Sequence, residues 1–334
     1  MGRGNSVVSW YRTGMPSFYN GCDWVGVGGD PPNLSFASGL KRGGLVVPKF
    51  DDYRIVILQQ VSGLAWLSEI FRLQKKGVRV LYEIDDHIHS VRKIKGHMAR
   101  EHYSKRKLAE YEKCMRAADG LIVSTEFLRK DYRKFNQKIW VCRNSIEAGR
   151  YSQFELPPRK DNKIHIGWAG GEGHQESVKL WLPAVQRIMD EREDVRFITI
   201  GLPFADEINA PGRTKSIPFV PIENVPAVMC NMDIGIAPAG RGNFFRAKSD
   251  LRFLEAGALG IPLVADPFVY KDLRDTETGF HAINAEQAYE GLIALVDDPA
   301  WREEMSGNVR EYVLTNRCIE KEAEQWVEVF MGVV

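Results

Sequence analysis

The sequence predicts an α/β protein with two domains, each built on a parallel sheet. Short apolar runs alternate with longer helix-like runs from residue 54 onward, a pattern typical of parallel sheets covered by helices on both faces. The chain has 334 residues, more than one hydrophobic core usually spans. A polar, proline-containing link at residues 151–162 interrupts the series. We therefore expect two such domains in series, with ligands outside the carboxyl ends of the strands, in an interdomain cleft.

The N-terminal series begins with a β-prone run, Ser6–Trp10, and a turn-rich stretch from Tyr11 to Gly44. Two apolar strands then flank an amphipathic helix within residues 54–83, which predicts a βαβ unit with a right-handed crossover. A charged helix and a strand–helix–strand series follow. In chain order, the elements expected after Gly44 are 54–59, 62–76, 78–83, 98–118, 120–124, 125–135 and 138–142.

The C-terminal series repeats the same alternation after the polar link. Its expected strands are 164–168, 195–201, 216–220, 233–237 and 263–265. Its expected helices, besides a short one in the segment 244–266, are 176–191, 225–230, 285–297 and a last one from Pro299 onward. The pattern places an N-terminal domain at 1–155 and a C-terminal domain at 156–315, with a C-terminal helix, 316–334, packing back toward the N-terminal domain.

Composition and charge exclude several classes of protein. The net charge of +1 and the lack of a charged tail argue against a nucleic-acid partner. No apolar run reaches the roughly 18–20 residues that span a bilayer, so no transmembrane segment is expected. The five cysteines have no CxxC spacing, which is typical of reduced thiols and not of a structural zinc site. We expect a cytoplasmic protein.

The segment from Phe244 to Asp266 carries the clearest functional signal. A polar loop runs into a short helix that carries one acid, Glu255, and Gly-Ile-Pro at 260–262 ends that helix before an apolar strand. Backbone N–H groups at a helix start favour an anion, and a carboxylate further along could accept hydrogen bonds from a ribose. The chemistry indicates a nucleotide diphosphate. The loop residues proposed to hold it are Arg246, Lys248, Ser249 and Asp250.

A glycine-rich loop, Gly167–His174, follows a strand and opens a helix. Its glycines, Gly170 and Gly171 among them, would let the backbone approach a phosphate closely. The spacing matches neither GxGxxG nor a Walker loop. A tight strand–helix turn without a ligand is the alternative interpretation of this loop.

Two acids and two histidines follow the second strand of the N-terminal domain. The pattern Asp85-Asp86-His87-x-His89 suits general acid/base chemistry, a divalent metal site, or plain helix capping and lining of a cleft. We favour the interpretation without a metal, because no third cluster completes a coordination set. Further upstream, Tyr11–Pro16 is a candidate lining for an acceptor pocket.

These residues resemble a known family. The run from Lys248 to Val264 looks like the donor-binding signature of GT-B glycosyltransferases, specifically the large retaining family 4. Four other stretches are similar to parts of the same fold, and one of them, Tyr82–Asp86, is common in a bacterial and phage branch of the family. The resemblance covers most of residues 54–315. Those other stretches are Tyr82–Asp86, Ala118–Thr125, Ile166–Gly171 and Asp194–Gly201.

The resemblance implies a GT-B fold, with two Rossmann-like domains facing a cleft, and a hexose transferred from a UDP- or GDP-sugar to an acceptor hydroxyl with retention and without metal. It implies no cofactor beyond the nucleotide-sugar donor, and a glycan, a lipid-linked precursor or a protein as acceptor. Carried over by position, Glu255 would contact the ribose, and Lys248 and Arg246 would balance the leaving diphosphate. Asp86 and His87 would lie on the acceptor side. The further donor-binding positions are Gly170, Gly171, His174, Ser249 and Asp250.

One position departs from the family pattern. Two glutamates separated by seven residues are usual, and Ala247 stands where the first is expected. Lys248, Ser249, Asp250 or Glu172 would then recognise the donor sugar. A non-catalytic nucleotide- or sugar-binding protein on a degenerate GT-B scaffold is the alternative function. A third possible function is that of an NAD-dependent oxidoreductase, but the sequence lacks the dinucleotide-binding fingerprint.

Overall fold

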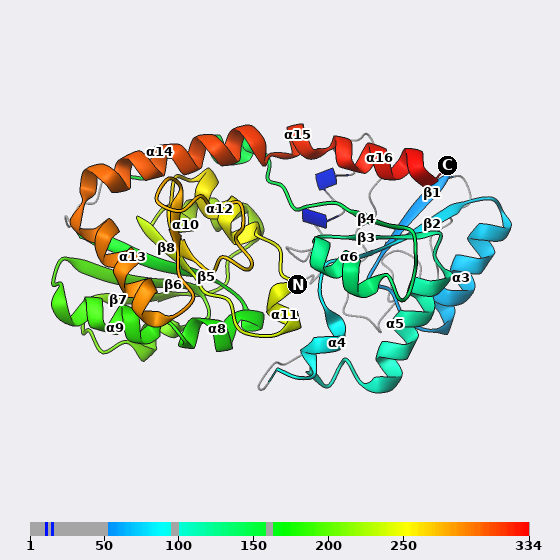
Figure 1. The fold of residues 1–334 in the computed structure, drawn as a ribbon, viewed down its shortest axis with the longest axis horizontal. Helices are drawn as coiled ribbons and strands as arrows, with labels where there is room; N and C mark the ends of the chain where they lie inside the picture. The colour runs from blue at the N-terminus through cyan, green and yellow to red at the C-terminus, as the bar shows by residue number, and fades with distance from the viewer. Residues whose placement is uncertain (1–10, 13–14, 17–52, 95–99, 158–162, 334) are drawn as a thin grey trace, which may run out of the picture. The chain divides into compact units, whose positions relative to one another are not determined.

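The chain forms two compact units in a computed structural model that describes residues 11–12, 15–16, 53–94, 100–157 and 163–333 (Figure 1). Unit 1 comprises Met1–Asn144, Ala247–Ser249 and Glu322–Val334. Unit 2 comprises Ser145–Arg246 and Asp250–Lys321. The strand expected at 6–10 and most of the turn-rich stretch 11–44 lie outside the described residues.

Unit 1 contains a parallel sheet in the order β1-β2-β3-β4. Hydrophobic side chains of β2 alternate between its two faces. Val80, Tyr82 and Ile84 pack in a cluster with α3, α5 and α6, while Leu81 packs against Trp326 of α16. The elements are β1 (Ile55–Gln59), α3 (Leu64–Lys75), β2 (Arg79–Ile84), α4 (Ile88–Val91), α5 (Lys105–Ala117), β3 (Gly120–Val123), α6 (Glu126–Tyr132), β4 (Ile139–Val141) and α16 (Glu324–Val333).

Unit 2 contains a second parallel sheet, in the order β10-β9-β8-β5-β6-β7. Its strands are β5 (Ile164–Gly170), β6 (Val195–Gly201), β7 (Thr214–Ile217), β8 (Ile234–Ala237), β9 (Leu263–Ala265) and β10 (Gly279–His281). Its helices are α7 (Ala148–Ser152), α8 (Gln175–Lys179), α9 (Leu182–Glu191), α10 (Val225–Met229), α11 (Asn243–Arg246), α12 (Leu251–Ala258), α13 (Ala285–Asp297), α14 (Pro299–Asn316) and α15 (Ile319–Glu322), with short 3-10 turns η3 (Glu172–His174), η4 (Phe204–Glu207) and η5 (Ile222–Asn224).

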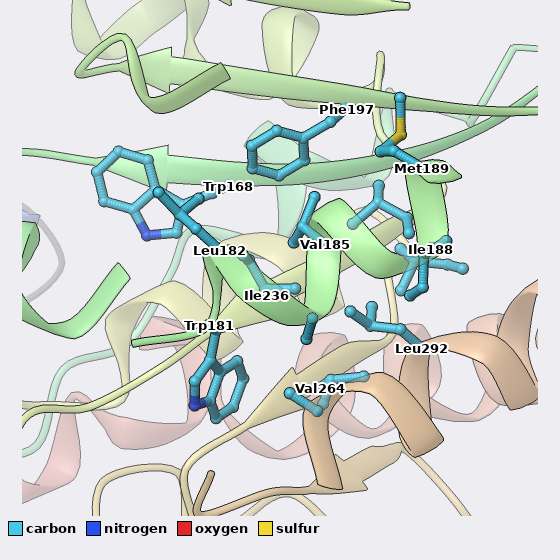
Figure 2. Packing of buried hydrophobic residues seen from close by; sticks show 14 of the residues in the cluster. Trp168, Trp181, Leu182, Val185, Ile188, Met189, Phe197, Ile236, Val264 and Leu292 are labelled. Atoms are coloured by element: carbon cyan, nitrogen blue, oxygen red, sulfur yellow. The ribbon is translucent and has the colours of Figure 1, made fainter. Parts of the chain in front are cut away.

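One hydrophobic cluster joins the centre of this sheet to α9 and α13 (Figure 2). Trp168 and Phe197 from the strands pack with Val185 and Ile188 of α9 and Leu292 of α13. Elsewhere in unit 2, α12 and α14 pack together, and a Cβ on the helical Gly257 would crowd Val309 and Val313. A glycine at this position lets the two helices approach closely.

Capping residues explain several helix starts. Ser104 Oγ accepts from Lys107 N at 3.2 Å, and Thr125 Oγ1 accepts from Leu128 N at 3.3 Å. Asn284 and Asp298 cap α13 and α14 in the same way, and Pro299 occupies the first helical position of α14. A side-chain oxygen at this position satisfies an N–H group that has no partner within the helix.

The structure corrects three of the expected elements and adds one. The helix expected at 176–191 is two helices, α8 and α9, because Pro183 cannot donate within a helix and is favoured in a first turn. The helix expected at 98–118 is shorter: α5 begins at Lys105, after the Ser104 cap, and ends at Ala117. The strand expected at 216–220 lies earlier, at Thr214–Ile217, and ends before Pro218. The short edge strand β10 was not predicted, because its three residues show no periodicity.

Among the described residues, no helix is long and apolar enough to cross a bilayer.

Candidate functional site

In unit 1, the carboxyl end of β2 carries a cluster of acids. Asp85 Oδ1 accepts a hydrogen bond from Gln60 Nε2 at 2.9 Å, and Asp86 Oδ1 pairs with Lys248 Nζ at 2.7 Å. Burial, reinforced by the nearby Asp86 and Glu83 carboxylates, raises the pKa of Asp85 to about 8. Asp85 therefore keeps its proton at neutral pH, while Asp86 lies opposite a cation. A carboxyl group that keeps its proton beside one that is ion-paired is an arrangement suited to acid/base work.

Asp85 belongs to the Asp85–His89 pattern but is not one of the predicted site residues. A pair of adjacent acids at a strand end was the available signal. The sequence could not show which acid would have its pKa raised and which would meet Lys248.

The tripeptide Ala247–Ser249 is attached to unit 1 at each of its three residues. Ala247 is 1 % exposed and belongs to the hydrophobic cluster around β2, and its carbonyl accepts from Thr125 Oγ1 at 3.2 Å. Lys248 pairs with Asp86. Ser249 Oγ accepts from Asn144 Nδ2 at 2.8 Å. These contacts hold the ammonium of Lys248 in one place.

A buried ion pair between Arg12 and Glu83 supports this attachment. Arg12 is 1 % exposed, and its Nε donates to Glu83 Oε1 at 2.7 Å. Its Nη1 donates to Asn144 Oδ1 at 2.9 Å, and Asn144 in turn holds Ser249. Burial raises the pKa of Glu83, and the Arg12 charge opposes that shift. Arg12 therefore lies in the interior of unit 1 and does not line an acceptor pocket as the sequence suggested.

His87 is also buried, at 4 % exposure. Its Nε2 lies 3.0 Å from Asp131 Oδ2, and its ring stacks on Tyr132 with centroids 5.7 Å apart. Its Nδ1 is enclosed and has no hydrogen-bond partner among the residues that the structure describes. Neither nitrogen is therefore placed to reach a substrate directly, and the imidazole instead fastens the segment after Asp86 to α6.

The four polar side chains of the Asp85–His89 pattern point to separate partners. Asp85 meets Gln60 and Asp86 meets Lys248, whereas His87 meets Asp131. His89 Nε2 lies 3.1 Å from Glu112 Oε1. Among the described residues, no group of three or more His, Cys, Asp or Glu could hold a metal ion.

In unit 2, the predicted donor-binding residues lie around the carboxyl end of β5 and on α12. Gly170 ends β5, Gly171 follows it, and His174 ends η3. The sheet order reverses here, because β6 and β7 lie on one side of β5 and β8 and β9 on the other. Ligands of open α/β sheets bind at such a reversal, outside the carboxyl ends of the strands.

The remaining predicted residues of unit 2 lie on or beside α11 and α12. Arg246 is exposed at the end of α11, and Glu255 is partly buried on α12. Asp250 is buried and does not cap α12 with its side chain. Its carboxylate accepts from Arg317 Nη1 at 2.7 Å, so this acid fastens the start of α12 to the residue after α14.

Arg252 is the residue of this region that sequence reasoning missed. Its guanidinium carbon lies 5.3 Å from the centroid of the Trp168 ring. A Cβ on Gly170 would overlap Arg252 Nη2 and lie 2.9 Å from Trp168 Cζ2. Gly170 is therefore needed to make room for a guanidinium, and only the tertiary structure shows which side chain fills that room.

No protein-family model matches the chain, and no curated protein matches its sequence. Solved structures do match in fold. Sucrose-phosphate synthase from Thermosynechococcus elongatus aligns with a TM-score of 0.62 and 13 % identity, over 84 % of this chain and 74 % of that one. HepE from Anabaena, solved with UDP-glucose, aligns with a TM-score of 0.63 and 13 % identity, over 84 % and 79 %. A glycosyltransferase from Rickettsia africae aligns with a TM-score of 0.59 and 13 % identity, over 83 % and 76 %.

These proteins are GT-B glycosyltransferases, and the α/β fold of this chain, with its two parallel sheets, is the GT-B fold. The expected fold class is confirmed.

Proposed function

We propose that this protein is a glycosyltransferase that moves a hexose from a UDP- or GDP-sugar to an acceptor hydroxyl, with retention and without a metal ion. The observation that carries the proposal is the reversal of strand order at β5, where Gly170, at the end of the strand, meets Arg252 of α12. This is where sheets of this kind bind nucleotides. A protein of the same fold, HepE, has been solved with UDP-glucose.

Each predicted residue takes a role that suits its surroundings. Gly170, Gly171 and His174 lie beside the phosphates, and Glu255 accepts from the ribose. Lys248 and Arg246 balance the charge of the departing diphosphate. Ser249 and Asp250 hold the loop that carries these two cations. Asp86 fixes the ammonium of Lys248 in advance, so that little reorganisation is needed when charge develops. His87 positions Asp86 through its bond to Asp131.

The test is turnover with a panel of UDP- and GDP-sugars, measured as nucleoside diphosphate released, with the anomeric product identified by NMR. We expect Lys248→Met to lower kcat by about 10² to 10³, the usual cost of removing one preorganised charge-stabilising group. Lys105→Met is the matched control, because Lys105 is an exposed lysine at the start of α5 in the same unit. EDTA should leave turnover unchanged. Full activity of Lys248→Met would contradict the assigned role.

A non-catalytic binding protein is the second candidate, and Ala247 favours it. The carboxylate expected at this position is absent, and the alanine is part of a hydrophobic cluster. Nucleotide-sugar binding without release of a nucleoside diphosphate, across the panel and with varied acceptors, would support this candidate over transfer. The same proposal includes a cytoplasmic location and an acceptor that is a glycan, a lipid-linked precursor or a protein.

A further inference from the structure

Arg252 is a cation at the reversal point of the unit 2 sheet, and no carboxylate of the described residues forms an ion pair with it. It belongs to α12, which follows β8, yet its guanidinium lies against Gly170 at the end of β5. The sheet order reverses at β5, which has β8 on one side and β6 on the other. The side chain therefore lies where a ligand of this sheet would bind.

One donor of this guanidinium has no hydrogen bond to any residue in the described part of the chain. Arg252 Nη1 is buried and has no partner, and the indole Nε1 of Trp168 beneath it is a second buried donor without one. Leaving a buried donor of a charged group unpaired is costly, so such a group calls for an explanation, and a ligand is one.

The neighbouring groups do not neutralise the charge. Tyr270 interacts with Arg252, and burial raises the pKa of this phenol, so it stays neutral at physiological pH. The Asp250 carboxylate is held by Arg317 through bonds of 2.7 and 3.3 Å. The guanidinium carbon lies 5.3 Å from the centroid of the Trp168 ring, and Nη2 lies beside Gly170.

We propose that Arg252 binds the diphosphate of the nucleotide donor in unit 2, and that Gly170 is a glycine because a side chain there would displace this guanidinium. The proposal rests on the proposed function and adds a residue to it. An arginine is suited to this task, since its planar fork can donate two parallel hydrogen bonds to phosphate oxygens. Phosphate oxygens would supply the acceptors that Nη1 lacks.

The experiment compares binding of UDP and GDP with binding of uridine and guanosine, by calorimetry, in the full chain. For Arg252→Gln we expect affinity for the better nucleoside diphosphate to fall at least about ten-fold, the usual effect of losing a charge-assisted hydrogen bond. Affinity for the matching nucleoside should stay the same. Arg252→Lys should restore part of the loss, because it keeps the charge without the fork.

Two further variants serve as a second test and as a control. Gly170→Ala leaves Arg252 in the chain but moves its guanidinium, so it should show the same selective loss if Arg252→Gln does not fold. Arg187→Gln is the matched control, because Arg187 is an exposed arginine of the same unit that pairs with Glu191 and Glu286. It should bind UDP and GDP as the wild type does.

The outcomes separate this inference from the proposed function. Equal diphosphate affinity in Arg252→Gln and wild type would overturn the role of Arg252 and leave the proposed function in place. Equal losses for diphosphate and nucleoside would also overturn it, because Arg252 would then be shaping the loop. Wild-type protein that binds none of the four compounds would overturn the proposed function, and this inference with it.

Discussion

Replacing Ala247 with glutamate restores the carboxylate that the family pattern leads one to expect. We predict that this substitution destabilises the attachment of Ala247–Ser249 to the rest of unit 1. Ala247 lies in the hydrophobic cluster of unit 1. A glutamate there has two options. It can bury its carboxylate in the cluster, or it can pull Ala247–Ser249 away from unit 1.

The structure sets the size of the effect. Burial would combine overpacking, about 1–3 kcal/mol, with the several kcal/mol needed to desolvate a carboxylate. Release of the tripeptide would break two hydrogen bonds, those of Thr125 and Asn144, and the partly exposed pair between Lys248 and Asp86. At about 1 kcal/mol each, these losses amount to about 3 kcal/mol. Release is the cheaper route, so it should set the outcome.

Limited trypsin digestion measures this directly, because the tripeptide contains Lys248. Ala247→Glu should be cut after Lys248 at a rate raised by about 100-fold, the ratio that about 3 kcal/mol allows when opening precedes cleavage. Ala247→Ser is the control, since it is small and uncharged and should remain protected. If Ala247→Glu resists trypsin as the wild type does and gains transferase activity, the position is an open site residue and the reasoning is refuted.

Two further predictions concern unit 1. The folded chain keeps the Asp85 proton up to a pKa of about 8, whereas the unfolded chain loses it near pH 4. Between these values the unfolded state binds fewer protons than the folded state. The free energy of unfolding therefore falls as pH rises, by at most about 1.4 kcal/mol per pH unit. The asparagine of Asp85→Asn does not titrate, so the free energy of unfolding of this variant, measured in urea, should rise relative to that of the wild type between pH 5 and pH 8. If the two free energies change with pH in parallel, Asp85 is not protonated in the folded chain. Trp326, a residue of α16, is 2 % exposed, and its replacement by alanine should lower the free energy of unfolding by about 3–5 kcal/mol. Met331→Ala on the same helix, where the side chain is 77 % exposed, should change the free energy of unfolding by less than about 0.5 kcal/mol. Similar losses for the two variants would show that α16 does not cover the sheet.

Most of the regular structure could be predicted because it repeats a local pattern. β6, β9 and α13 begin and end where the apolar periodicity and the flanking breakers placed them. The errors arose where that pattern is weak. Pro183 divides a stretch that is helical in composition, and β10 is too short to show a period.

The candidate site was predictable only in part. The motif that ends in Glu255 indicated a nucleotide, and the acids after β2 indicated reactive side chains. The partners of these residues come from far along the chain. Lys248 meets Asp86 across 162 positions, and Arg317 takes the Asp250 carboxylate across 67. Contacts at such separations leave no periodic signal, so no local pattern could assign them.

The sequence by itself determined the α/β class, the alternation that builds two parallel sheets, and the segment from Lys248 to Glu255 as a nucleotide-binding candidate, because each depends on residues near one another in the chain. The tertiary structure alone decided three other matters. Ala247 is a core residue of unit 1, Asp85 is the acid that keeps its proton, and Arg252 is the cation beside Gly170. Each of these depends on burial and on the charges that folding brings within a few ångströms, and a side chain acquires both only from its neighbours in space.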